Sequence, residues 1–189
     1  MKTLPNIITW MRIGIIPVFV VFFYLPWGWA RISAAGLFAI AGITDWLDGY
    51  LARSLSQTSE LGAFLDPVAD KLIVVSALIL LVSEANLPFF SIAAVIIASR
   101  EIIISALREW MAEIGKRANV AVSYLGKIKT VLQFLAILFL LLGRPDAMNN
   151  HPLIGLLGYF FLCIAAFMTI WSMLVYLSAA RNVLKARDE

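Results

Sequence analysis

Six long apolar stretches dominate this chain and restrict the folds that are open to it. Each is close to the roughly 20 residues that a helix needs to cross a bilayer. They cover residues 7–28, 32–52, 63–83, 89–111, 125–142 and 153–178. A backbone in lipid must satisfy its own hydrogen bonds, so each stretch is expected to be helical. The sequence therefore predicts an all-α, polytopic membrane protein with six transmembrane helices, in one membrane-embedded domain over residues 1–189.

The composition agrees with a membrane protein and excludes several other classes. Hydrophobic residues make up 62% of the chain and charged residues 14%, and the mean hydropathy is +0.91. These values exclude an ordinary soluble domain. The chain has one cysteine and one histidine, so neither an internal disulfide nor a zinc site is expected, because zinc prefers nitrogen and sulfur ligands. A metal bound here must be a hard cation with oxygen ligands.

Lysine and arginine residues are distributed unevenly between the two ends of the six stretches. The segments expected on one side of the membrane contain only Arg31 and Arg144. The other side carries Lys2, Arg53, Arg108, Lys116, Arg117, Lys127, Lys129, Arg181, Lys185 and Arg187. Such an excess marks the cytoplasmic side of a membrane protein. Both termini are therefore predicted to be cytoplasmic, and no nucleic-acid partner is expected.

Four aspartates lie close together at the cytoplasmic ends of the second and third stretches. Asp45 and Asp48 are three residues apart, and Asp66 and Asp70 are four apart. On a helix, each spacing places the two side chains on one face. A carboxylate at membrane depth costs a few kcal/mol on insertion scales (about 2.5–3.5), so four of them indicate a functional site.

These carboxylates favour a particular chemistry. Two adjacent helices could bring all four together, and four negative charges in an apolar site need compensation. Two divalent cations would provide it, and carboxylate oxygens suit Mg²⁺, Mn²⁺ or Ca²⁺. Paired metals are typical of displacement at phosphorus, because they stabilise the attacking and leaving oxygens together.

Three other interpretations of the aspartates remain open. Asp45 and Asp48 could form buried salt bridges with Arg53 and Lys71. Intramembrane carboxylates also mark proton and ion pathways, so a cation carrier is a remote alternative. A membrane scaffold without enzymatic activity is the third possibility. The clustering of the carboxylates at one interface favours the phosphorus chemistry over a pathway through the bilayer.

The residues around the aspartates resemble the signature of the CDP-alcohol phosphotransferase family. All eight signature positions are present, in the string Asp45-x2-Asp48-Gly49-x2-Ala52-Arg53-x8-Gly62-x3-Asp66-x3-Asp70. The segment 5–12 resembles the family's amino-terminal nucleotide-side segment. Segments 99–101, 106–110 and 126–130 resemble the phosphatidylglycerophosphate synthase branch of the family in bacteria.

This resemblance implies transfer of a phosphatidyl group from CDP-diacylglycerol to sn-glycerol 3-phosphate, with release of CMP. It implies two Mg²⁺ or Mn²⁺ ions held by Asp45, Asp48, Asp66 and Asp70, with Asp70 also acting as general base. CDP-diacylglycerol would be bound by Asn6, Thr9, Arg12, Gly49, Ala52, Arg53 and Ser59. A homodimer in the bacterial inner membrane is also implied, with its active site facing the cytoplasm. Sister enzymes that use serine, inositol phosphate or phosphatidylglycerol as acceptor remain alternatives.

A phosphorylated acceptor needs cations near the aspartates. Arg108, Lys127 and Lys129 lie at the inner ends of the fourth and fifth stretches, and we expect them to bind glycerol 3-phosphate. Arg100 is a weaker candidate, because Glu101 or Glu109 could neutralise it. We call the three cations Arg108, Lys127 and Lys129 the glycerol-phosphate clamp. Basic residues that flank membrane helices also serve as positive-inside anchors, so the alternative is that these residues only fix the orientation of the helices in the membrane.

Overall fold

The computed structural model consists of six α-helices. The structure describes residues 4–55, 60–85, 87–115, 124–143 and 152–188, and within them the side chains of residues 9–44, 65, 68–85, 87–115, 126–143 and 153–178. The helices are α1 (Leu4–Tyr24), α2 (Ala30–Leu55), α3 (Glu60–Glu84), α4 (Phe90–Glu113), α5 (Tyr124–Leu142) and α6 (Pro152–Asp188). The described residues contain no strand. The prediction of six helices in an all-α fold is confirmed.

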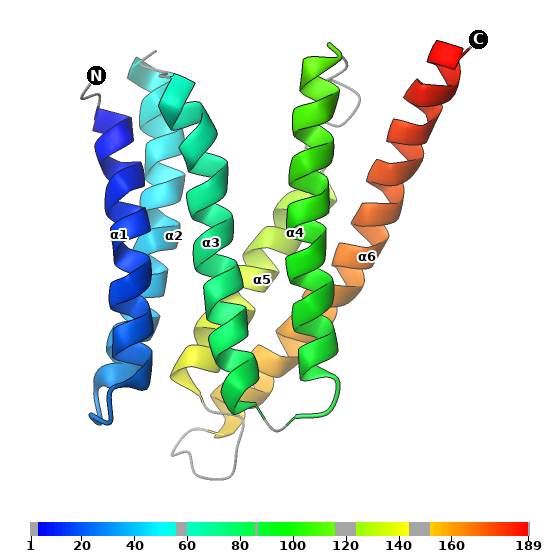
Figure 1. Cartoon of the computed structure of the whole chain (residues 1–189). Helices are drawn as coiled ribbons and strands as arrows, with labels where there is room; N and C mark the ends of the chain where they lie inside the picture. Colours follow the sequence, from blue (N-terminus) through cyan, green and yellow to red (C-terminus); the bar gives the residue numbers. More distant parts are fainter. Residues whose placement is uncertain (1–3, 56–59, 86, 116–123, 144–151, 189) are drawn as a thin grey trace.

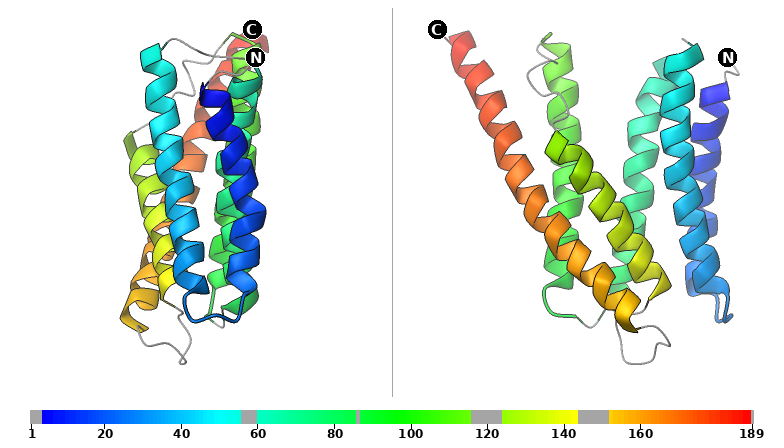
Figure 2. Two further views of the ribbon diagram at one scale, coloured as in Figure 1. Left: turned by 90° about the vertical axis from the view of Figure 1, so that its left-hand side faces the viewer. Right: turned by 180° about the vertical axis from the view of Figure 1, so that it is seen from behind.

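Successive helices run in opposite directions, so both chain termini lie at one end of the bundle (Figure 1). Helix α1 packs against α2 and α3, and α4 packs against α3 and α6. Helix α5 contacts α2 and α3 and packs most closely along α6. Figure 2 shows α5 and α6 side by side at the end opposite the termini. Helix α5 therefore connects α2 and α3 to α6, while α4 packs between α3 and α6.

Helix boundaries differ from those expected from hydropathy alone. Helix α1 ends at Tyr24 rather than at residue 28, because Pro26 disfavours helical backbone in the residue before it. Helix α6 continues to Asp188, ten residues beyond the expected end at residue 178. Its added residues include alanine, leucine, lysine and arginine, which favour a helix in water as well as in lipid.

The core is built from aromatic and aliphatic side chains with small residues between them. Phe19, Phe38, Leu78, Ile97 and Ile137 are buried, and so are many alanines at helix contacts. Small residues allow close approach of helix backbones, which is typical of membrane bundles.

Gly42 on α2 shows one such close approach. A Cβ atom at this position would collide with the ring of Phe134 on α5. That ring stacks on Phe38, with 4.9 Å between centroids and 20° between ring planes. The missing side chain thus lets the two rings meet between α2 and α5.

Large apolar side chains also face outward. Ile79, Val95, Phe167 and Trp171 are among those with more than half of their surface exposed. Within the part of the chain that the structure describes, two helical segments, Phe90–Glu113 and Leu153–Ser178, are long and apolar enough to cross a membrane. Two shorter apolar stretches, Thr9–Tyr24 and Ala30–Thr44, form the C-terminal part of α1 and the N-terminal part of α2. An apolar exterior of this kind suits lipid as the surrounding medium.

Candidate active site

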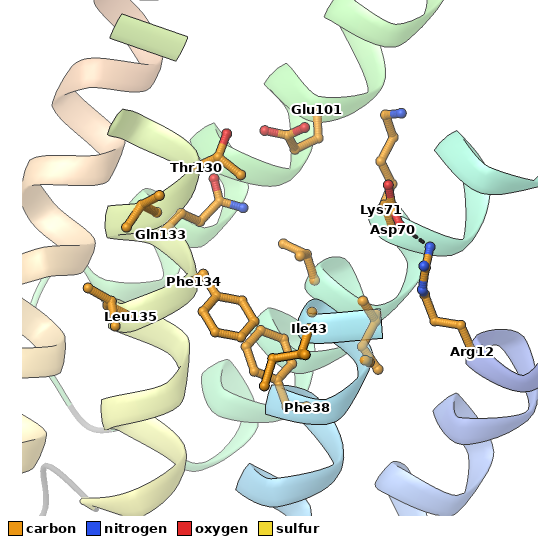
Figure 3. Close-up of a pocket in the computed structure, with 15 residues that line it drawn as sticks. Arg12, Phe38, Ile43, Asp70, Lys71, Glu101, Thr130, Gln133, Phe134 and Leu135 are labelled. Carbon is orange, nitrogen blue, oxygen red and sulfur yellow. Dashed lines mark hydrogen bonds and ion pairs between the residues drawn. The ribbon is translucent and has the colours of Figure 1, made fainter. Parts of the chain in front are cut away.

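A cavity of about 540 Å³ lies between α1, α2, α3, α4 and α5 (Figure 3). Its polar lining comes from α1, α3, α4 and α5, and its apolar lining largely from α2, α3 and α5. The lining residues are Arg12, Phe38, Ala41, Gly42, Ile43, Asp70, Lys71, Ile73, Val74, Glu101, Thr130, Val131, Gln133, Phe134 and Leu135. The stacked rings of Phe38 and Phe134 belong to the apolar lining. The cavity therefore combines charged groups with a hydrophobic wall, which suits an amphiphilic ligand.

Asp70 on α3 contributes its carboxylate to this cavity. The Arg12 guanidinium on α1 donates a hydrogen bond from Nη1 to Asp70 Oδ1 and forms an ion pair with it (Figure 3). Arg12 is almost wholly buried, whereas Asp70 keeps about a third of its side chain exposed. A buried guanidinium requires such a charge partner. The pair fixes the orientation of a carboxylate that remains accessible from the cavity.

The other three aspartates are placed by their backbones only. Asp45 and Asp48 lie in the C-terminal part of α2, and Asp66 lies in α3 one turn before Asp70. Helices α2 and α3 contact each other, and these segments lie at the end of the bundle that carries both termini (Figure 1). The side chains of Asp45, Asp48 and Asp66 lie outside the described residues. Among side chains that are described, no group of three or more His, Cys, Asp or Glu could hold a metal.

The backbone arrangement and donor chemistry fit a divalent cation. Both pairs of aspartates have spacings that place their members on one helix face, and the carboxylate that is described, that of Asp70, lines the cavity. All four would offer oxygen ligands, which hard cations such as Mg²⁺ and Mn²⁺ prefer.

The residues predicted to bind CDP-diacylglycerol fall into two groups. Thr9 and Arg12 are buried on α1, and Arg12 lines the cavity beside Asp70. Asn6 lies in α1, and Gly49, Ala52 and Arg53 lie in α2, but their side chains are outside the described residues. Ser59 lies between α2 and α3, also outside the described residues. Of this set, only Arg12 is therefore placed at the cavity by its side chain.

Lys129 is one of three cations predicted to bind the acceptor, and it is buried on α5. Its ammonium group donates a hydrogen bond to Glu101 Oε1 on α4 and forms an ion pair with it. Arg100 also pairs with Glu101, with 3.3 Å between Nη1 and Oε1. Glu101 thus neutralises Arg100. The sequence suggests either Glu101 or Glu109 as the neutralising residue. Lys71 completes the cluster, since it lies within electrostatic range of Asp70 and Glu101.

Arg108, the second predicted cation, lies on α4 and contacts α6. Its Nη2 donates a hydrogen bond of 2.9 Å to the hydroxyl of Tyr176, and its guanidinium lies 5.2 Å from the centroid of that ring. Arg100 lies 5.7 Å from the same centroid and donates to Ser172 Oγ at 3.3 Å. Cation–π contacts of this kind add to the hydrogen bond. Tyr176 therefore positions two guanidinium groups on the same side of α6.

The third predicted cation, Lys127, is exposed near the start of α5. Lys129 and Arg108 lie within electrostatic range of each other. No contact between Lys127 and either of these residues is seen in the part of the chain that the structure describes.

Glu101, Lys71 and Gln133 line the cavity but were absent from the predicted site. Glu101 has a sequence signal, because a carboxylate within an apolar helix is itself a functional indicator. Lys71 has a similar signal, since it directly follows Asp70. Gln133 has none, because a single glutamine in an apolar stretch resembles ordinary packing. Its position facing the cavity comes from the tertiary structure alone (Figure 3).

Known proteins resemble this chain over nearly its whole length. A family model described as CDP-alcohol phosphatidyltransferase matches residues 2–177. Proteins from Salmonella paratyphi A and Pectobacterium atrosepticum are each 50% identical to this chain over 179 residues, which is 95% of both chains. A protein from Sodalis glossinidius is 51% identical over 180 residues, covering 94% of this chain and 96% of its own. All three are named CDP-diacylglycerol–glycerol-3-phosphate 3-phosphatidyltransferase. Because these matches extend over nearly its full length, the chain belongs to the CDP-alcohol phosphatidyltransferase family, a family of membrane proteins.

Proposed function

We propose that this chain transfers the phosphatidyl group of CDP-diacylglycerol to sn-glycerol 3-phosphate, giving phosphatidylglycerophosphate and CMP in the synthesis of anionic phospholipids. The observation that carries the proposal is the 50% identity, over 95% of both chains, to proteins named for this reaction. The cavity supports it independently, because its charged and apolar linings match a lipid with a phosphorylated head group.

The two substrates approach the cavity from different helices in this proposal. CDP-diacylglycerol is bound from α1, α2 and the connection to α3, by Asn6, Thr9, Arg12, Gly49, Ala52, Arg53 and Ser59. Glycerol 3-phosphate is bound from α4 and α5, by Arg108, Lys127 and Lys129. The burial of Lys129 and its pairing with Glu101 support a cation held at a defined place, rather than a mobile surface anchor.

Asp45, Asp48, Asp66 and Asp70 would hold two Mg²⁺ or Mn²⁺ ions. When bound, such ions would neutralise the diphosphate and make CMP a better leaving group. The residues themselves account for the other steps.

Asp70 accepts the proton of the glycerol C1 hydroxyl in the proposed reaction. The hydroxyl oxygen forms a bond to the β-phosphorus of CDP-diacylglycerol, the bond from that phosphorus to the CMP oxygen breaks, and CMP leaves with the electron pair. No covalent enzyme intermediate forms. Arg12 holds the Asp70 carboxylate in one orientation through their ion pair, which favours a proton acceptor placed within hydrogen-bond reach of the nucleophile.

The proposal places the active site at the cytoplasmic side of the bacterial inner membrane. Its support is the excess of lysine and arginine at the end that carries the aspartates and the location of both termini at that end (Figure 1). The resemblance to the family also predicts a homodimer within the membrane lipid.

A membrane assay with CDP-diacylglycerol and separate acceptors tests the proposed function. The purified full chain should release CMP with sn-glycerol 3-phosphate, and serine, inositol phosphate and phosphatidylglycerol should give none. Chelation of divalent ions should abolish the release, and Mg²⁺ or Mn²⁺ should restore it. Release of CMP with a different acceptor would assign the chain to a sister enzyme. Metal-dependent cation uptake into proteoliposomes without lipid turnover would favour a carrier.

A further inference from the structure

Gln133 on α5 is buried and polar, and it faces the cavity (Figure 3). Its side chain is 4% exposed, and Oε1 has no hydrogen-bond partner among the described residues. A buried carbonyl oxygen without a partner costs about 1–3 kcal/mol, so such groups are rare unless a ligand or water satisfies them. Gln133 therefore brings to the cavity wall a side-chain amide whose oxygen has no partner among the described residues.

The other side chains in the described lining that carry oxygen each have at least one hydrogen-bond or ion-pair partner. Asp70 pairs with Arg12, and Glu101 pairs with Lys129 and Arg100. The Thr130 hydroxyl, one turn from Gln133 along α5, donates to the Gly126 carbonyl at 2.9 Å. This contrast distinguishes Gln133 from its polar neighbours.

We infer that Gln133 Oε1 accepts a hydrogen bond from the non-reacting C2 hydroxyl of a polyol phosphate, and so selects the acceptor substrate. The inference rests on the proposed function and goes further by assigning a specificity-determining residue to the α5 wall. The amide acts by recognition alone and takes no part in proton transfer.

The chemistry of the two substrates leads to this hydroxyl. An acceptor oxygen needs a donor, and the glyceride and diphosphate portions of CDP-diacylglycerol carry only acceptors. The donors of cytidine belong to the nucleotide, which is expected on the side of α1 and α2. The C1 hydroxyl of glycerol 3-phosphate is assigned to Asp70 on α3. The C2 hydroxyl lies between C1 and the phosphate.

The position of Gln133 agrees with the order of the groups along glycerol 3-phosphate, which is the C1 hydroxyl, the C2 hydroxyl and the phosphate. It lies four residues after Lys129, on the same face of α5, and Lys129 is one of the proposed phosphate-binding cations. Asp70 faces the same cavity from α3 (Figure 3). A glycerol phosphate with its phosphate toward Lys129 and its C1 hydroxyl toward Asp70 therefore presents C2 between the α3 and α5 walls.

The test compares sn-glycerol 3-phosphate with 3-hydroxypropyl phosphate, which lacks only the C2 hydroxyl. The wild-type chain should use glycerol 3-phosphate with a kcat/KM roughly tenfold or more above that of the analogue, the range expected for one buried hydrogen bond. Gln133→Met keeps the length of the side chain and removes the amide. It should lose most of this preference by lowering kcat/KM for glycerol 3-phosphate alone, while the value for the analogue changes less than about threefold.

Thr130→Val is the matched control, because it removes a cavity-lining hydroxyl that is already satisfied within α5. It should keep the wild-type preference. Equal use of both acceptors by the wild-type chain would overturn the inference without requiring any variant. An unchanged preference in Gln133→Met, or an equal loss on both acceptors, would also overturn it. If the wild-type chain fails with glycerol 3-phosphate but releases CMP with another acceptor, the proposed function fails instead.

Discussion

Lys129 on α5 is ion-paired with Glu101 on α4, although the backbones of these two helices do not approach each other closely in the described ranges. The long side chains cross the space between the helices beside the cavity. Lys129 is almost wholly buried, and Glu101 is mostly buried. The pair both links α5 to α4 and holds a cation close to the place where a phosphorylated substrate is proposed to bind.

Removing either member of this pair should destabilise the chain. Lys129→Met or Glu101→Gln leaves a buried charge without its main partner, which costs about 3–5 kcal/mol. The double variant should recover part of the stability lost in Glu101→Gln, because Lys129 no longer remains without its partner, although Arg100 still loses its contact with Glu101. Thermal unfolding in detergent measures both effects. The double variant should still have impaired kcat/KM for glycerol 3-phosphate, because Lys129 is absent. A double variant no more stable than Glu101→Gln would contradict the pairing.

Asp70→Asn should abolish turnover and largely spare the binding of CDP-diacylglycerol. Asparagine keeps the shape of the side chain but cannot accept the proton of the attacking hydroxyl, and loss of a general base costs roughly 10²–10⁴ in rate. CMP release and an equilibrium binding assay measure the two effects separately. Glu113→Gln is the matched control, because it removes a carboxylate from an exposed position at the end of α4. Substantial turnover by Asp70→Asn would exclude Asp70 as the base.

Arg108→Ala should chiefly raise the KM for glycerol 3-phosphate, by about tenfold or more, because it weakens ground-state and transition-state binding alike. Tyr176→Phe keeps the ring beneath Arg108 and removes only the hydroxyl that receives its hydrogen bond. It should raise the same KM by a smaller factor. Steady-state kinetics with each substrate varied separately provides the test, and the KM for CDP-diacylglycerol should not change. An unaffected KM for glycerol 3-phosphate in Arg108→Ala would remove this residue from the clamp.

Gly42→Ala should destabilise the bundle by about 1–3 kcal/mol, because the added methyl group collides with the Phe134 ring and forces it to move. Gly36→Ala, on the same helix, is the control, since a Cβ there meets no atom within 4 Å. The control should be neutral or more stable by up to about 1 kcal/mol, because alanine favours a helix over glycine. Thermal unfolding of the two variants in one detergent makes the comparison. Equal stability would mean that the ring contact is not tight.

Much of the fold could be predicted from hydropathy, because lipid requires both apolar side chains and internally bonded backbone. That requirement identified six helices but not their full lengths. Hydropathy registers only the portion suited to lipid, so it missed the polar extension of α6 to Asp188. The same limitation hid the early start of α3 at Glu60, which lies in a polar connection.

The candidate site also has a part that the sequence could predict and a part that it could not. The spacing of Asp45, Asp48, Asp66 and Asp70 along two helices is a local property, so the sequence alone determined which residues carry the proposed chemistry and which family they resemble. The pairings of Arg12 with Asp70 and of Lys129 with Glu101 join residues 58 and 28 positions apart. Such partners depend on which helix faces pack together, and α4 and α5 lack even close backbone contact in the described ranges. Only the tertiary structure could therefore select these ion pairs and bring Gln133 to face the cavity.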